Sequence, residues 1–333
     1  MFGLSRILFP TDLSPTGRQA FLQAASLAAR TGAEVHVLHV ATDAGTAPEG
    51  VRFTPFDEAL LREQLRIDLF TWHTHVGAGM TRKARFVQAE VPGVPPDAAI
   101  LAYADRYDID LIVMGTHGRR GLWHLLFGSV AEAVIHGAAC PVLTVHEDEA
   151  EDVRLDHVLV PIDFSAHASA ALVYAKRLAL LYRGTVSLLF VAESHVVSVP
   201  YDTGLPALAL LRADPEITAH AEAALRQLDA ATEAADVPTD FYVRRGDAAH
   251  EIAAFARDHA ADLIVMTRYG HTDVTAHGLS AVTEKVVRTS ACPVLTLPVP
   301  VLTEASARPG AAKLPEAGPP QEPYTARFHH GPL

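Results

Sequence analysis

The sequence predicts a tandem α/β protein with two doubly wound, five-stranded parallel sheets that carry helices on both faces. Three observations support this fold class. Short apolar runs alternate with longer segments of helical periodicity, blocks of sequence recur in the second half of the chain, and 333 residues suffice for two domains. An alternating strand–helix pattern implies a parallel sheet, whose right-handed crossovers place helices on both faces.

The recurring blocks indicate duplication of a whole domain. They lie 151 or 152 positions apart and pair Ile7–Ser14 with Val158–Ser165, Asp110–Gly115 with Asp262–Thr267, and Ala139–Thr144 with Ala291–Thr296. We expect domains at residues 1–146 and 156–299, joined by an acidic linker at 147–155. Pro, Ala, Gly and Glu dominate residues 300–333, which predicts a disordered tail.

The first copy alternates five predicted strands with four predicted helices. The strands are Arg6–Pro10, Glu34–Val40, Lys83–Ala89, Leu111–Met114 and Val142–Val145. The helices are Thr16–Thr31, Asp57–Val76, 95 to about 107, and Ser129–Gly137, and residues 42–56 are predicted to form a loop.

The second copy repeats this order of elements. Its strands are expected near 157–161, 185–191, 240–244, 263–266 and 294–297. Its connection at 192–214 is longer and unusually apolar, which is compatible with a lid, an interdomain or dimer contact, or a packed surface insertion.

The charge, apolar runs and cysteine content of the chain argue against several classes of protein. The net charge of -12 argues against a nucleic-acid or anionic-membrane binder, because the long-range field repels both. No apolar run approaches the ~20 residues of a membrane span, and the N-terminus lacks a signal sequence, so a cytoplasmic protein is expected. The only cysteines, Cys140 and Cys292, occupy equivalent positions, which favours small buried residues over a redox pair.

A glycine-containing loop follows the fourth predicted strand. The apolar run that ends at Met114 leads into Gly115 and Gly118, and nine residues later Gly128-Ser129 opens a helix. Glycine lets the backbone approach an anion, and the N–H groups and dipole of a helix start favour negative charge. We interpret this loop as a phosphate cradle. The loop also carries His117 and His124, which are candidates for contact with phosphate or metal. Arg119 and Arg120 are candidates for neutralising the γ-phosphate. A solvated loop face is the alternative for all four.

Asp12 is expected to face the same crevice as this loop. Ligands of an open parallel sheet bind at the carboxyl ends of the strands where the winding reverses, here between the first and fourth strands. A carboxylate repels triphosphate, so Asp12 is either an acceptor for the base or sugar, a group near a metal, or a turn or N-cap residue supported by Ser14. Residue type alone leaves these alternatives open.

The spacing Gly115-x2-Gly118-x9-Gly128-Ser129, together with the opening Phe9–Ser14, resembles the nucleotide-binding universal stress protein family. The resemblance covers residues 1–146 and about 155–299. It implies a sheet of strand order 3-2-1-4-5 that binds ATP. By position, it implies that Asp12 and Val40 flank the adenine with Thr11 beside them, and that Met114 and Gly115 line the nucleoside. Gly118, Gly128, Ser129 and Val130 would hold the phosphates and ribose. Pro10, His117 and Arg119 complete the predicted nucleotide-binding residues.

The second copy departs from this motif. Thr267 and Ser280 replace two of the three glycines and only Gly270 remains, while Asp273 adds a negative charge to the loop. Asp163 is kept. We predict weak or no ATP binding in the second copy, with a different nucleotide as the alternative.

Three functions compete. The first is a stress or regulatory protein in which ATP and Mg²⁺ order the loop and bias an interface with an unknown protein partner. The second is an enzyme that hydrolyses ATP slowly or phosphorylates itself at Ser129, although no dedicated catalytic base is evident. The third is a structural module in which the two copies form a pseudo-dimer, with a possible further homodimer and incidental nucleotide. No P-loop or dinucleotide motif is present.

Overall fold

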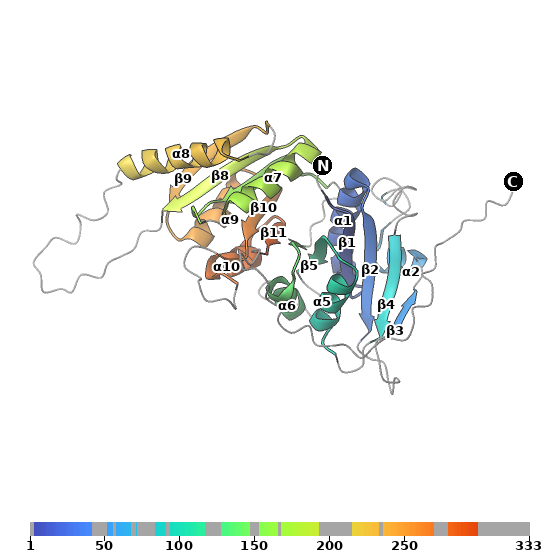
Figure 1. Ribbon diagram of the computed structural model, residues 1–333. Coiled ribbons are helices and arrows are strands. Elements are labelled where there is room, and N and C mark those ends of the chain that lie inside the picture. Colours follow the sequence, from blue (N-terminus) through green and yellow to red (C-terminus); the bar gives the residue numbers. More distant parts are fainter. Residues whose placement is uncertain are drawn as a thin grey trace, which may run out of the picture. The chain divides into compact units, whose positions relative to one another are not determined.

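The chain forms two compact units. The structure is a computed structural model (Figure 1), and it describes residues 3–41, 52–55, 58–67, 71, 84–90, 94–116, 128–146, 153–165, 168–192, 215–232, 236–269 and 279–298. The predicted linker core and tail lie outside these residues. No helix among the described residues is long and apolar enough to span a membrane.

Unit 1 is built on a parallel sheet with the central strand order β4-β2-β1-β5-β6. This is the predicted 3-2-1-4-5 order. The strands are β1 (Arg6–Thr11), β2 (Glu34–Ala41), β4 (Ala84–Glu90), β5 (Leu111–Gly115) and β6 (Val142–Val145). The central strand β1 pairs in parallel with both β2 and β5, and its residues Ile7, Leu8 and Phe9 are fully buried. A strand covered on both faces requires such a continuous apolar run.

Two predictions for unit 1 were wrong in detail. Residues 42–56, predicted as a loop, contain strand β3 (Arg52–Pro55), which pairs antiparallel to β4 and covers its outer side. The helix predicted over Asp57–Val76 is interrupted, because α2 covers only Glu58–Gln64, although Thr71 is again helical. Arg66 then has a φ of 53°, and the Ile67 N–H donates to the Arg62 carbonyl, a left-handed turn that terminates a helix.

The remaining helices of unit 1 match the predicted segments. The short 3-10 helix η1 (Pro15–Gly17) leads into α1 (Arg18–Thr31), and α5 (Pro96–Arg106) and α6 (Ser129–Gly137) follow later. Right-handed crossovers place α1 and α2 on one face of the sheet and α5 and α6 on the other, where these last two helices contact each other. The layers therefore enclose the buried strands β1 and β5.

Unit 1 also includes a strand from the end of the second repeat. Strand β11 (Val294–Leu297) pairs antiparallel to β6, with Leu295 opposite Leu143. Two buried threonines make reciprocal hydrogen bonds across this pair: Thr144 Oγ1 donates to the Val294 carbonyl at 3.0 Å and Thr296 Oγ1 to the Val142 carbonyl at 3.2 Å. The contacts of β11 therefore group it with unit 1, although it is the last strand of the second repeat.

Unit 2 repeats the architecture in the strand order β10-β7-β8-β9. Its elements are β7 (His157–Pro161), α7 (Ala168–Tyr182), β8 (Thr185–Ala192), α8 (Pro215–Ala230), β9 (Thr239–Arg245), α9 (Ala248–Asp258), β10 (Leu263–Thr267) and α10 (Ala281–Thr289). Helix α8 lies alongside β8 and β9 (Figure 1). Most of the apolar connection at 192–214 lies outside the described residues, so its role stays a prediction.

Candidate functional site

The predicted site residues gather at the carboxyl edge of the unit 1 sheet, where they belong to four elements. Pro10 and Thr11 end β1 and Asp12 follows, Val40 lies near the end of β2, Met114 and Gly115 end β5, and Gly128, Ser129 and Val130 form the cap and first turn of α6. The structure thus brings together all predicted site residues that it describes. His117, Gly118 and Arg119, with Arg120 and His124, lie outside the described residues.

Asp12 forms a tight turn at the end of β1. Its Oδ1 accepts hydrogen bonds from the Ser14 N–H at 2.9 Å and from the Ser14 hydroxyl at 2.5 Å. Leu13 between them has a φ of 61°, and its N–H donates to Thr11 Oγ1 at 3.0 Å. Asp12 is therefore a turn residue, one of the alternatives that the sequence left open, and this half-buried turn holds it at the crevice. Its contact with a base or sugar stays a prediction.

The start of α6 has the features of an anion site. The cap residue Gly128 makes no side-chain cap, and the exposed Ser129 begins the helix. The first amides of a helix have no partner within the helix, and together with the dipole they attract negative charge. The Gly128 N–H donates to the Thr116 carbonyl at 2.9 Å, and a Cβ added to Gly128 would lie 2.9 Å from the same oxygen. This contact places the helix start directly against the end of β5.

The second repeat keeps the turn at the end of its first strand. Asp163 Oδ1 accepts the Ser165 N–H at 2.9 Å, and Phe164 between them has a φ of 57°. These values match those of Asp12, Leu13 and Ser14. The base end of the predicted site therefore has the same backbone geometry in both repeats.

The phosphate end differs between the repeats. Ser280 takes the place of Gly128 with nearly the same backbone angles, but its side chain accepts the Thr283 N–H and so caps α10. Thr283 in turn donates through its hydroxyl to the Thr267 carbonyl at 3.0 Å, and the Thr267 hydroxyl donates to the Tyr269 carbonyl at 2.8 Å. In the second repeat, side chains of the chain itself therefore form hydrogen bonds at the position that corresponds to the predicted phosphate cradle.

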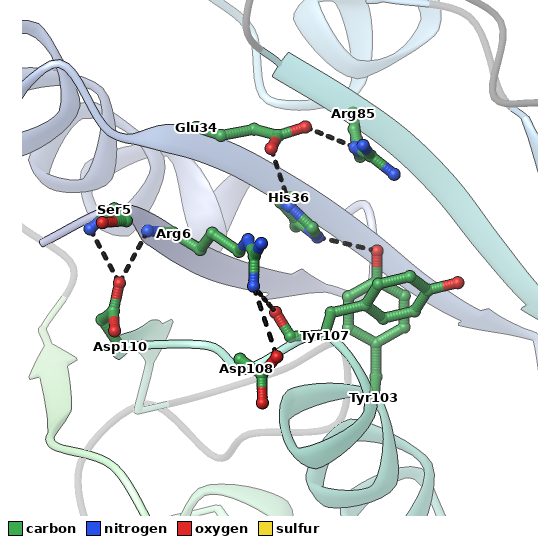
Figure 2. Close-up of polar contacts among 9 residues, drawn as sticks. All are labelled: Ser5, Arg6, Glu34, His36, Arg85, Tyr103, Tyr107, Asp108 and Asp110. Carbon is green, nitrogen blue, oxygen red and sulfur yellow. Dashed lines mark hydrogen bonds and ion pairs between the residues drawn. The ribbon is translucent and has the colours of Figure 1, made fainter.

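A separate polar cluster lies at the opposite, amino-terminal edge of the unit 1 sheet (Figure 2). His36 on β2 is buried, and its Nδ1 lies 2.9 Å from the Tyr103 hydroxyl. Its Nε2 lies 3.6 Å from Glu34, which forms an ion pair with Arg85. Burial lowers the pKa of His36 to about 4 and raises the pKa of the Tyr103 phenol. These groups join β2, β4 and α5 far from the predicted nucleotide residues.

Part of this edge is the same in both repeats, which indicates a role in the fold. Asp110 accepts the backbone N–H groups of Ser5 and Arg6, and Asp262 accepts those of Asp156 and His157, at 2.7–2.9 Å. Asp110 therefore links the start of β5 to the start of β1, and Asp262 links the start of β10 to the start of β7.

Metal-binding clusters and reactive thiols are two further kinds of site. The described residues contain no group of three or more His, Cys, Asp or Glu side chains that could hold a metal ion. Cys292 is buried, its N–H donates to the Ser290 hydroxyl, and burial raises the pKa of its thiol to about 11, which disfavours the reactive thiolate. Cys140 is half-buried.

Two residues beside the site, Thr116 and His146, were not predicted from the sequence. Thr116 occupies a variable position within the glycine motif, and His146 follows the last strand of the repeat. Their side chains meet, with Thr116 Oγ1 3.2 Å from His146 Nδ1. A comparison of the repeats holds the signal that could have found them, because Arg268 and Pro298 take these positions in the second copy.

Comparison with known proteins follows the same division into repeats. The model of the universal stress protein family matches residues 3–146 and 154–298. A universal stress protein of Methanocaldococcus jannaschii is 32% identical over 158 residues, which cover 44% of this chain and 84% of that protein. Universal stress protein A homolog 1 of Coxiella burnetii is 34% identical over 142 residues, which cover 42% of this chain and 94% of that protein.

A solved structure extends the likeness of the fold to both repeats. The crystal structure of a universal stress protein from Archaeoglobus fulgidus aligns with a TM-score of 0.57 at 22% identity, covering 88% of this chain and 96% of that one. The α/β architecture and the two matched segments agree with the predicted tandem arrangement. The chain belongs to the universal stress protein family.

Proposed function

We propose that this chain is a cytoplasmic stress-response protein that binds ATP through its first repeat and uses the bound nucleotide to regulate a protein partner. The observation that carries the proposal is the contrast between the two helix starts. Helix α6 begins at Gly128 without a side-chain cap, whereas Ser280 caps α10 with its own hydroxyl. An uncapped helix start leaves its amides to phosphate oxygens.

The residues of the first repeat fit the parts of ATP. Asp12 and Val40 lie at the ends of neighbouring strands and would flank the adenine, while Gly128 and Ser129 would hold the phosphates. Because the described residues hold no cluster of metal ligands, Mg²⁺ would enter with the nucleotide, coordinated mainly by phosphate oxygens and water. The proposed role of the bound nucleotide is to order the phosphate loop.

Calorimetric titration of the full chain with ATP and Mg²⁺ tests the proposal. We expect one site per chain. Two sites of similar affinity would show that the second repeat also binds ATP, and the lack of any binding would refute the ATP function.

Matched substitutions locate that site. Gly128→Ser combined with Ala131→Thr copies the capping residues of α10 onto α6. It should weaken ATP binding by about tenfold or more, because the new cap competes with phosphate and the added Cβ, 2.9 Å from the Thr116 carbonyl, displaces the helix start. The reverse pair in the second repeat, Ser280→Gly with Thr283→Ala, should leave the first site unchanged. Equal affinity of the two paired variants would contradict the assignment to the first repeat.

The second candidate function is self-phosphorylation. The specific observation in its favour is that Ser129 is exposed at the proposed phosphate end. Mass spectrometry after incubation with ATP and Mg²⁺ tests this candidate. Phosphate on Ser129 that is lost in Ser129→Ala identifies a self-phosphorylating enzyme, whereas an unmodified Ser129 refutes self-phosphorylation.

A further inference from the structure

Thr116 connects three segments around the proposed phosphate end. Its N–H donates to the Val145 carbonyl at the end of β6 at 3.1 Å, and its carbonyl accepts the Gly128 N–H at 2.9 Å. Its hydroxyl lies 3.2 Å from Nδ1 of His146. Only 1% of Thr116 is exposed, so these bonds are shielded from competing water. Thr116 therefore fixes the position of α6 relative to the sheet.

His146 acts on this connection from the neighbouring strand. It directly follows β6, and its ring holds the Thr116 side chain in one orientation. The same threonine supplies the carbonyl against which Gly128 packs so closely that an added Cβ would lie 2.9 Å away. The histidine thus anchors the residue whose carbonyl binds the Gly128 N–H, and a shift of Thr116 would move that N–H and the helix start that follows it.

The second repeat shows which hydrogen bond of this arrangement is common to both repeats and which is made only in the first. The Ser280 N–H donates to the Arg268 carbonyl at 2.9 Å, so the backbone bond that closes the loop is common to both repeats. The side-chain bond does not occur in the second repeat, because Pro298 takes the position of His146. The ring nitrogen of proline is an amide nitrogen without a hydrogen, so it cannot pair with a side chain. The histidine–threonine pair occurs only in the repeat that keeps the full glycine motif.

We propose that His146, through Thr116, is a positioning residue for the phosphate end of the nucleotide site. The inference rests on the proposed ATP function of the first repeat. In this role His146 acts on the phosphates only through the threonine whose carbonyl places the start of α6. The pair therefore sets the affinity for the phosphates of ATP and leaves the affinity for the adenosine part unchanged.

The test compares ATP with adenosine on the full chain, both measured by calorimetry. His146→Phe and Thr116→Val keep the approximate size of each side chain and remove the bond. Each should weaken ATP binding about fivefold, as expected for the loss of one hydrogen bond, and change adenosine binding less than twofold. The double variant should lose no more than either single variant, because both remove the same bond.

Two controls distinguish positioning from general destabilisation. Thr116→Ser keeps the hydroxyl and should restore ATP affinity. Thr296→Val removes another buried threonine hydrogen bond of unit 1, at the β6–β11 pair, and should not alter the ratio of ATP to adenosine affinity. Circular dichroism confirms that each variant is folded.

The outcomes separate this inference from the function on which it rests. If the unsubstituted chain binds no ATP, both fail. If it binds ATP but His146→Phe leaves that affinity unchanged, or lowers ATP and adenosine affinity equally, the ATP function stands and the positioning role is refuted.

Discussion

A single capping residue distinguishes the helix starts of the two repeats. Gly128 and Ser280 have nearly the same φ and ψ and donate the same backbone hydrogen bond, so the glycine is not required by an unusual conformation. The difference lies in the side chain: the serine hydroxyl accepts from the amide of Thr283. At a helix start, one hydroxyl group can take the place of an external ligand.

His36 makes the stability of unit 1 sensitive to acid. Its pKa is about 4 in the folded chain because of burial, against 6.5 for an exposed histidine. Between these pH values the unfolded chain binds more protons than the folded one, so stability falls as the pH falls. From pH 7 to pH 5 we expect unit 1 to lose about 2 kcal/mol.

Urea unfolding followed by tryptophan fluorescence measures this loss. Both tryptophans of the chain, Trp72 and Trp123, belong to the first repeat, so the signal reports on unit 1. His36→Phe should remove most of the pH dependence of the free energy of unfolding. It should also lower that free energy by an amount that does not depend on pH, since the Tyr103 hydroxyl loses this hydrogen bond. An equal slope with pH in both proteins would show that other groups cause it.

The sequence predicted the strands and most helices because their apolar periodicity is strong. It also predicted that the described candidate residues lie at the ends of strands and at a helix start. It could not show where a helix stops without glycine or proline, as at Arg66, which takes up a left-handed conformation. It also could not show that β3 would pair with β4, because pairing depends on tertiary contacts. The Thr116–His146 bond stayed hidden for the same reason, since it joins residues 30 positions apart.

Helices α7 and α8 are joined by an ion pair between a buried lysine and a half-buried aspartate. Lys176 is buried, and its Nζ lies 2.7 Å from Asp229 Oδ1, whereas Ala25 takes the lysine's position in α1. Asp229→Ala should destabilise unit 2 by about 3 kcal/mol, because it leaves a buried ammonium without its counter-charge.

Hydrogen exchange of α7 peptides provides the measurement, since unit 2 contains no tryptophan. The control is Lys176→Met with Asp229→Ala, which removes both charges and should recover much of the lost protection. Equal loss in the single and double variants would mean that packing, and not the unpaired charge, is responsible.

At the scale of the whole molecule, the sheet of unit 1 is completed by β11. Its sequence, Val-Leu-Thr-Leu, nearly repeats that of β6, Val-Leu-Thr-Val, and the threonine bonds between them are reciprocal. Two copies of β6 could therefore form the same pair. We expect an excised first repeat, residues 1–152, to dimerise through its β6 edge.

Light scattering after size-exclusion chromatography tests this expectation. A synthetic peptide of residues 290–299, which contains β11, should compete for the β6 edge and convert the dimer to monomer. A fragment that is monomeric without the peptide would show that β6 needs no partner strand.

The position of β11 also has a consequence for protein synthesis. The ribosome adds Val294 149 positions after Val145, the last residue of β6. At roughly 5–20 residues per second, β6 has a free edge for about 7 to 30 seconds on the nascent chain. Neighbouring nascent chains on one messenger could pair through this edge during that interval. A tandem gene places the competing strand on the same polypeptide, at a local concentration that a separate subunit lacks.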